Sequence, residues 1–175
     1  LIEIDITRGN LDPLPIAVSP LFQDDNSKRN SINELKIENV GSEISLVVEN
    51  NLKISGLFNP LSKEAFLQKP DIAHLKPRFE DWALIKAQAL ITGKVTIENK
   101  KLKVEFRLWD ILAGREMMAL AFTTVPSNWR RVGHIISDKV YERLTGEKGY
   151  FDTRIIYVSE EGPKTARVKK LAIMD

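Results

Sequence analysis

Apolar and polar residues alternate over the first seven positions of the chain. Isoleucines at positions 2, 4 and 6 alternate with Glu3, Asp5 and Thr7, the period-2 pattern of a strand with one apolar face. Gly9-Asn10 interrupts this pattern, and prolines follow at positions 13 and 15. The pattern predicts a short strand-forming segment that a Gly/Pro-containing joint tethers to the rest of the chain.

Strands and helices are predicted in turn after this joint. Ile16-Ala17-Val18, between two prolines, suits a buried strand, whereas the polar stretch 23–33 is predicted to be a loop. A helix is expected over 39–55, followed by Gly56 as a left-handed stop and by an extended segment at Leu57-Phe58 that ends at Asn59-Pro60. A second helix is expected over 79–88, with Trp82 on its buried stripe. The apolar residues at helical spacing in the first of these helices are Ile44, Val47, Val48 and Leu52.

Three strand-like runs then predict an antiparallel meander. They cover 89–98, 102–111 and 116–125, and Asn99-Lys100 and Ala113-Gly114 supply the turns. The last helix is expected from Ser127, as its N-cap, to Thr145, with Gly146 beyond it. Its apolar seam consists of Val132, Ile136, Val140 and Leu144.

The order β-α-β-α-β-β-β-α predicts an α/β fold of the α+β kind. We expect one mixed sheet of about five strands, with two or three helices packed on it. After a short hinge at 146–149, strand-like runs at 154–159 and 168–174 are joined by a turn at Gly162-Pro163. Because two strands cannot build a core of their own, the chain is expected to end inside a second domain.

Composition narrows the class of protein only a little. The 175 residues carry 26 Lys+Arg against 24 Asp+Glu, and the net charge of +2 gives no strong field for nucleic acid or anionic lipid. The absence of cysteine excludes disulfides and thiolate chemistry. No apolar run approaches the ~20 residues that span a bilayer, so direct membrane insertion is not expected. The chain begins at Leu1 rather than Met, so we expect that a preceding segment was either processed away or trimmed off.

No constellation of catalytic or metal-binding residues stands out. His74 is expected in a loop and His134 on the solvent side of the last helix, and neither has a recognisable metal spacing. Asp110 and Glu116 could face each other across a hairpin, but carboxylates at a hairpin end are usually solvated turn residues. We predict no enzyme, no metal and no cofactor. Three serines that lack a nucleophile-elbow context are expected to have capping or surface roles: Ser45, Ser127 and Ser137.

Runs of basic residues allow a second class of protein, a nucleic-acid-binding α/β domain. They occur at 100–103, at Arg130-Arg131 and at 164–170. Recognition of RNA on a mixed sheet requires exposed aromatic residues beside the charge. Core packing explains Phe106, Trp109 and Phe122 more simply, and a solvated charged face is the usual meaning of such runs. Nucleic-acid binding is therefore the alternative and not the main prediction.

The amino-terminal segment has two readings from its pattern alone. It could be an ordinary edge strand of this domain, or it could add a strand to the free edge of another protein's sheet. Strand addition draws affinity from main-chain hydrogen bonds, with alternate side chains supplying selectivity. The residues concerned are Leu1, Ile2, Glu3, Ile4, Asp5, Ile6 and Thr7.

Several motifs together resemble the amino-terminal domain of the TolB family. Pro15 to Phe22, Ser55 to Leu61, and Trp82 with Leu90 to Val95 are similar to its conserved segments, with Thr92 where Val is more usual. The specific part is the last helix with its hinge: Trp129 to His134, Ser137-Asp138, Glu142 to Gly149, and then Thr153 to Val158. The stretches 23–39 and 63–76 fit no pattern of the family.

The resemblance implies a non-catalytic protein of the periplasmic Tol–Pal system, which supports outer-membrane integrity and cell division. It implies three parts: a partner-binding segment at 1–12, the α/β domain at 13–149, and the first strands of a β-propeller at 150–175. In this family the segment matching 1–12 binds the C-terminal domain of TolA, and the propeller, mostly absent here, binds Pal. The resemblance therefore favours strand addition by residues 1–7.

A two-state tail follows as a hypothesis. In one state residues 1–7 fold back on this domain, and in the other they are free and donate a strand to TolA, with Pal docking biasing the balance. We also expect the segment 154–175 to be poorly ordered or to pair with a neighbouring molecule, because its edges are open.

Overall fold

The computed structural model describes residues 2–4, 12–153, 155–161 and 168–174 of the chain. Eight strands, five α-helices and two short 3-10 turns lie in these ranges. In chain order, the first elements are β1 (Leu14–Val18), β2 (Phe22–Gln23), α1 (Asp25–Leu35), α2 (Val40–Ile54), β3 (Phe58–Pro60), η1 (Lys63–Ala65), α3 (Pro70–Ala73) and α4 (Phe79–Leu84). They are followed by β4 (Ala89–Glu98), β5 (Lys101–Asp110), β6 (Arg115–Thr124), η2 (Pro126–Asn128), α5 (Trp129–Thr145), β7 (Ile155–Glu161) and β8 (Val168–Met174).

A mixed sheet of six strands organises the domain, as the α/β prediction requires. Its order is β3-β1-β4-β5-β6, and β2 pairs with the second half of β4. β1 runs parallel to both β3 and β4, whereas β4, β5 and β6 form the predicted antiparallel meander. The turn between β4 and β5 uses Asn99 and Lys100, both with positive φ, which matches the twist of a tight hairpin.

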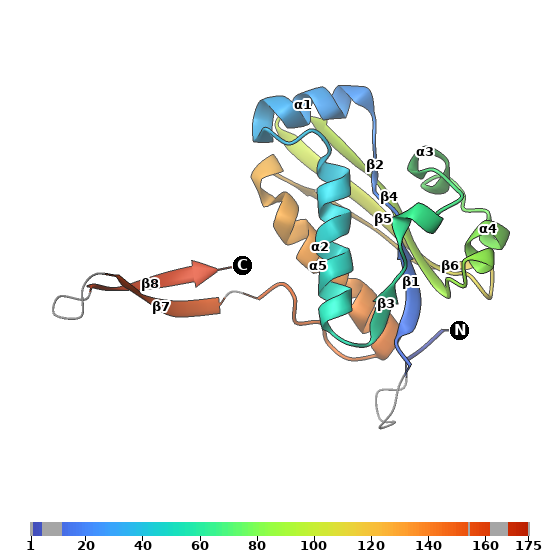
Figure 1. The fold of residues 1–175 in the computed structure, drawn as a ribbon. Helices are drawn as coiled ribbons and strands as arrows, with labels where there is room; N and C mark the ends of the chain where they lie inside the picture. The colour runs from blue at the N-terminus through green and yellow to red at the C-terminus, as the bar shows by residue number, and fades with distance from the viewer. Residues whose placement is uncertain (1, 5–11, 154, 162–167, 175) are drawn as a thin grey trace.

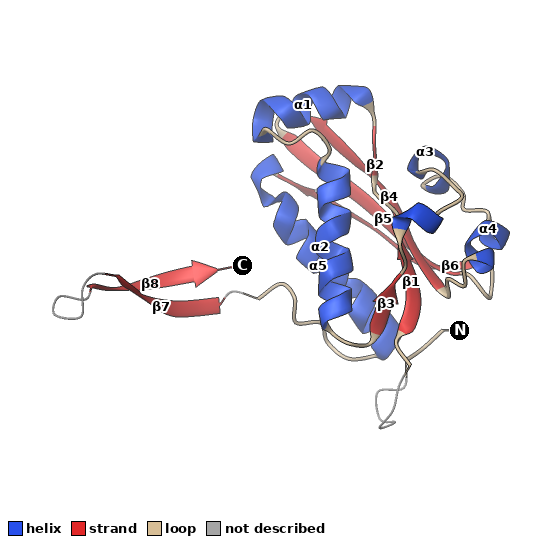
Figure 2. Cartoon of the chain, viewed as in Figure 1, coloured by secondary structure: helices blue, strands red, loops and turns tan. Residues whose placement is uncertain are grey.

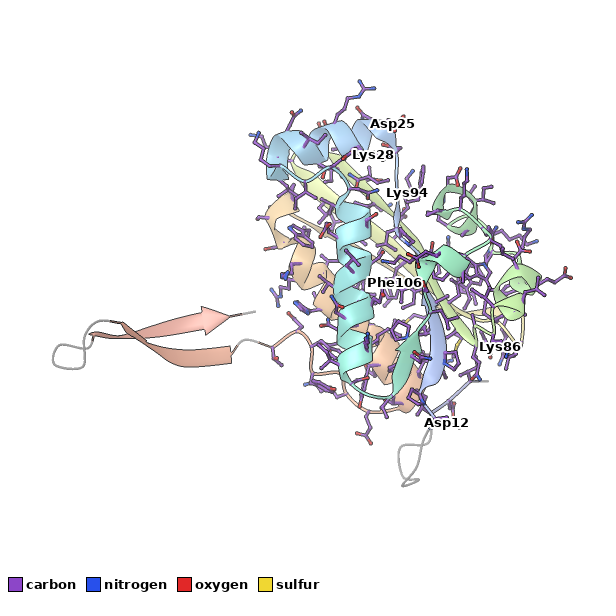
Figure 3. All side chains as sticks on the ribbon, in the orientation of Figure 1. Asp12, Asp25, Lys28, Lys86, Lys94 and Phe106 are labelled. Atoms are coloured by element: carbon purple, nitrogen blue, oxygen red, sulfur yellow. The ribbon has the colours of Figure 1, made fainter. Side chains whose placement is uncertain are left out.

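The main core lies between this sheet and the helices α1, α2 and α5, which cover one of its faces (Figure 1). Strand residues alternate between buried and exposed along β5, so its apolar face meets the helices. Phe106, labelled in Figure 3, lies in this core, and it stacks on Phe122 of β6. The predicted seam of α5 is buried throughout: Val132, Ile136, Val140 and Leu144.

A smaller cluster occupies the opposite face of the sheet, where α3 and α4 lie (Figure 2). Trp82 is its largest member, and the buried side chain of Gln68 holds it in place. The Gln68 Oε1 atom accepts hydrogen bonds from the Trp82 Nε1 group at 3.0 Å and from the Arg78 amide at 2.9 Å. Its Nε2 group donates to the Lys76 carbonyl at 3.2 Å. The buried amide of Gln68 therefore joins the stretch 63–76, which matched no motif, to α4.

Three expected boundaries differ from the structure. The loop predicted over 23–33 is wrong, because Asp24 caps α1 by accepting a hydrogen bond from the Ser27 amide at 2.8 Å. The helix predicted over 79–88 ends at Leu84, where Lys86 has φ 63° and the Ala87 amide bonds back to the Trp82 carbonyl. Ser127 is not the N-cap of α5, since it lies inside the 3-10 turn η2 that precedes this helix.

The carboxyl-terminal residues form the antiparallel hairpin β7–β8, which pairs Ile155 with Met174 and Glu161 with Val168. Figure 1 shows this hairpin to one side of the α/β body. The two predicted strands are thus present and pair with each other, so the described part of this segment has regular structure. The turn expected at Gly162-Pro163 lies outside the described residues.

Candidate functional site: the amino-terminal segment and its dock

Residues 2–4 lie against the α/β body through their alternate side chains. Ile2 and Ile4 are half-buried and pack on the main core, whereas Glu3 is exposed. This is the alternation that the sequence predicted, but these three residues are extended without strand pairing. Leu1, Asp5, Ile6 and Thr7, the other members of the predicted strand, lie outside the described residues. The structure therefore places two of the seven predicted contact residues, Ile2 and Ile4, against the core.

One end of the dock is the buried carboxylate of Asp110, the last residue of β5. Its Oδ2 atom accepts a hydrogen bond from the Ile2 amide at 3.2 Å, and its Oδ1 atom accepts one from the Ala113 amide at 2.9 Å. The side chain thus fixes the β5–β6 turn and the amino-terminal segment together. The expectation of a solvated turn carboxylate is wrong here, because Asp110 is only 1% exposed.

Asp110 and Glu116 do not face each other across the hairpin. The strand register sets Asp110 opposite Arg115 and Trp109 opposite Glu116. Glu116 instead forms an ion pair with Arg107 at 3.2 Å. The two carboxylates therefore do not form a pair suited to acid–base chemistry.

The other end of the dock is the last turn of α5. The Ile4 amide donates a hydrogen bond to the carbonyl oxygen of Leu144 at 2.7 Å. The last carbonyls of a helix have no partner within it, and Gly146, with φ 77°, turns the chain away after bonding to the Glu142 carbonyl. The amino-terminal segment therefore satisfies a helix end that would otherwise face solvent.

An open groove of about 680 Å³ lies beside this contact. Charged residues line its rim, among them Lys139 and Glu142, which form an ion pair at 3.2 Å. The lining consists of Glu3, Ile4, Met118, Lys139, Glu142, Arg143, Thr145 and Gly146. Glu3 thus enters a surface that carries two basic side chains and one acidic one from α5.

Residues 150–152, which follow the predicted hinge, are held by side chains of α5. The carboxylate of Asp138 accepts hydrogen bonds from the Phe151 amide at 2.7 Å and from the Asp152 amide at 3.1 Å. Asp152 in turn binds Arg131 at 3.0 Å, and this hydrogen bond raises the pKa of the exposed Arg131 guanidinium. Burial raises the pKa of the Tyr141 phenol, whose ring packs on Tyr150 and Phe151. The motif at the end of α5 is therefore a structural clamp on residues 150–152.

The histidines and two of the serines have interior structural contacts. The prediction that His134 faces solvent is wrong. This residue faces α2, since its Nδ1 atom lies 2.9 Å from the Asn51 Nδ2 atom. His74 ends α3, and its ring stacks on Phe22. Ser45 and Ser137 are buried, and each donates a hydrogen bond to a carbonyl one turn earlier in its helix. In the described ranges no three His, Cys, Asp or Glu side chains are grouped to hold a metal ion.

The basic runs and aromatic residues do not form a stacking platform within the described side chains. Lys103 pairs with Glu105 at 2.8 Å, and Arg131 pairs with Asp152. Phe106 is buried, and the Trp109 Nε1 group donates to Thr92 at 2.9 Å. No observation on these residues favours the nucleic-acid alternative. No helix among the described residues is both long and apolar enough to cross a bilayer.

These features define a class of protein: a small α/β domain whose amino-terminal segment docks on the end of its last helix. The model of the TolB amino-terminal domain family matches residues 2–117, and the chain belongs to this family. It is 80% identical over all 175 residues to the Tol-Pal system protein TolB of Pelagibacter ubique (strain HTCC1062), of which it spans 39%. The crystal structure of TolB from Acinetobacter baumannii has the same fold. That similarity has a TM-score of 0.71 at 23% identity and covers 94% of this chain and 37% of the other.

Proposed function

We propose that this domain is a non-catalytic protein-interaction module of the Tol–Pal system in the periplasm. Its amino-terminal segment, residues 1–12, reaches the C-terminal domain of TolA, and residues 1–7 add a strand to it. Pal binds the β-propeller of the whole protein, of which residues 150–175 are the beginning. The linked system supports outer-membrane integrity and cell division. Membership of the TolB family supports this assignment.

The observation that carries the proposal is how residues 2–4 are held. Each of two main-chain amides, those of Ile2 and Ile4, makes one hydrogen bond, and neither bond belongs to a strand ladder. A foreign sheet edge offers the same amides equivalent acceptors. A single net hydrogen bond contributes only about 1 kcal/mol, so bonds to a partner strand can replace the bonds that hold the docked segment.

The side chains of the segment suit such an exchange. Ile2 and Ile4 share one face and pack on the core, whereas Glu3 points away from it. A partner sheet that buries the isoleucine face reproduces the apolar contact that the segment loses on release. The same alternation then supplies selectivity, because a one-residue slip would bring Glu3 onto the apolar face.

The test compares TolA binding by the intact chain and by a chain that begins at Pro13. We expect the C-terminal domain of TolA to bind the intact chain and to lose measurable binding to the shortened one, measured by titration calorimetry. Ile4→Asp is a second variant, expected to weaken binding because it places a charge on the buried face, and Lys53→Glu on the exposed end of α2 is its matched control. Undiminished binding of the shortened chain refutes the proposal.

A further inference from the structure

β6 is a long edge strand whose outer side has no partner strand in the described part of the chain. It has ten residues, and between Met117 and Thr124 it has neither a charge nor a proline. The opposite edge, β3, has only three residues and ends in Pro60. Natural sheets protect exposed edges by shortness, charge or proline, so β3 is protected and β6 is not.

α5 forms a wall along this edge. Four of its residues recur at intervals of four and line the space beside β6: Arg131, Ile135, Lys139 and Arg143. Two cavities lie between the helix and the strand, the groove of about 680 Å³ at Met118 and a second of about 290 Å³ at residues 121–124. The edge of β6 and the side of α5 therefore bound one surface, which we call the edge groove.

The floor of the edge groove is apolar. Met118 and Phe122 are partly buried against the core and line its two cavities. Leu120 lies between them on the same face of the strand, opposite Phe106, and is 37% exposed. An edge strand beside a helix, with alternate apolar side chains between them, is the geometry in which PDZ and PTB domains accept an extended peptide.

Charge and the chain's own residues indicate what this groove accepts. Its helical wall carries the basic residues Arg131, Lys139 and Arg143; Arg131 pairs with Asp152, and Lys139 pairs with Glu142, the one acid of this wall. At its near end lie Ile4, on the apolar side, and Glu3, beside the basic residues. The chemistry already present at that end is therefore an aliphatic side chain next to a carboxylate, in an extended backbone.

We propose that the edge groove is an acceptor site for an extended segment of another protein, in which aliphatic residues alternate with acidic ones. The segment pairs with β6 through its main chain, and its aliphatic side chains lie on Met118, Leu120 and Phe122. Its carboxylates face Lys139 and Arg143. This site accepts a strand, whereas the amino-terminal segment donates one, so one domain has two separate strand-mediated contacts.

The test uses the intact, isotopically labelled chain and a capped synthetic heptapeptide that alternates valine and glutamate. We expect slowed hydrogen exchange and shifted resonances at residues 117–124 on titration. Methylation of alternate peptide amides blocks the ladder and is expected to weaken binding more than about ten-fold. Lys139→Glu is expected to weaken it about five-fold at low salt, whereas the matched control Lys53→Glu leaves it unchanged.

Three results overturn the proposal. Equal binding of the methylated peptide shows that no main-chain ladder forms. Changes confined to Ile2, Ile4 and Leu144 show that the peptide only displaces the amino-terminal segment. Concentration-dependent protection of β6 without peptide shows that a second copy of this chain, and not a foreign segment, occupies the groove. Loss of TolA binding by the chain that begins at Pro13 bears only on the amino-terminal segment, so the two proposals fail independently.

Discussion

The Ile4 amide and the Leu144 carbonyl oxygen, 2.7 Å apart, join the start of the chain to the end of α5. The bond satisfies one of the carbonyls that every helix leaves without an internal partner in its last turn. It involves only main-chain atoms, so it holds the segment without fixing the identity of its side chains. Such a contact can be exchanged for a ladder bond in another sheet at little net cost.

Asp110→Asn is predicted to loosen the amino-terminal segment. The carboxylate accepts bonds from both Ile2 and Ala113, and an amide keeps a single acceptor oxygen while turning an NH₂ group toward one of these donors. If the released bond contributes about 1 kcal/mol, TolA binding should strengthen about five-fold. Titration calorimetry measures this gain.

The control for this substitution is Glu116→Gln on the next strand, where the side chain pairs with Arg107 and does not contact the segment. It is expected to leave TolA binding unchanged. Weaker TolA binding by Asp110→Asn would show that the docked state assists the partner instead of competing with it.

Asp24 is predicted to make the stability of the domain depend on pH in the acid range. The hydrogen bond from the Ser27 amide lowers the pKa of this carboxyl below its usual value. A carboxyl whose pKa is lowered by folding stabilises fully above its unfolded pKa of about 4, and the contribution is lost as pH falls through the lower folded pKa. Asp24→Ala should therefore lower the free energy of unfolding at pH 7 by about 1 kcal/mol.

Asp24→Asn separates the contribution of the helix-capping hydrogen bond from that of the carboxylate charge. Asparagine caps helices about as well as aspartate, so this variant should match the parent at pH 7 and show less loss of stability between pH 5 and pH 2, values chosen to bracket the usual carboxyl range. Urea unfolding at these pH values measures the difference. Identical pH profiles for the parent and Asp24→Asn would show that the charge of Asp24 does not contribute to the pH dependence of stability.

Gln68→Ala is predicted to destabilise the smaller cluster around Trp82. The substitution leaves the Trp82 indole N–H and the Arg78 amide without their acceptor. A buried donor without a partner costs about 1–3 kcal/mol, so the urea midpoint should fall and the tryptophan fluorescence should shift to longer wavelength. Gln88→Ala is the control, because main-chain bonds to Pro15 and Ile111 hold that residue. Equal midpoints for the two variants would contradict the role given to Gln68.

Gly133→Ala is predicted to separate α5 from α2. A Cβ atom at this position would lie 2.8 Å from Val47 Cγ1 and 2.9 Å from Val47 Cβ. Overpacking of this kind costs about 1–3 kcal/mol, which exceeds the gain of about 1 kcal/mol from replacing a helical glycine. Adding Val47→Ala makes room and should recover part of the loss in urea unfolding. No recovery in the double variant would show that the close approach is not the cause.

The sequence predicts elements whose apolar residues have a clear period. The α5 seam from Val132 to Leu144 and the three strands of the meander are confirmed, because local spacing decides which of their faces is buried. The sequence did not predict α1, because its buried residues are Ser27 and Ser31 and therefore do not form a periodic apolar pattern. The Asp24 cap ahead of them was the available clue.

The candidate site could be predicted only in part. The alternation of Ile2 and Ile4 indicated one apolar face, and both side chains do pack on the core. Their acceptors could not be found from local pattern, because Asp110 is 108 positions from Ile2. That contact depends on the burial of a carboxylate at the end of β5, and on the tight turn that its other oxygen holds.

The most direct test of the two-state segment is hydrogen exchange of the Ile2 and Ile4 amides, measured by NMR with and without the C-terminal domain of TolA. We predict weak protection in the free chain, about five-fold for a bond of about 1 kcal/mol. On TolA binding both amides should become much more protected, while the resonances of the last turn of α5 shift as Leu144 loses its partner. An Ile4 amide that stays bonded to Leu144 in the complex, with an unchanged exchange rate, would contradict the account.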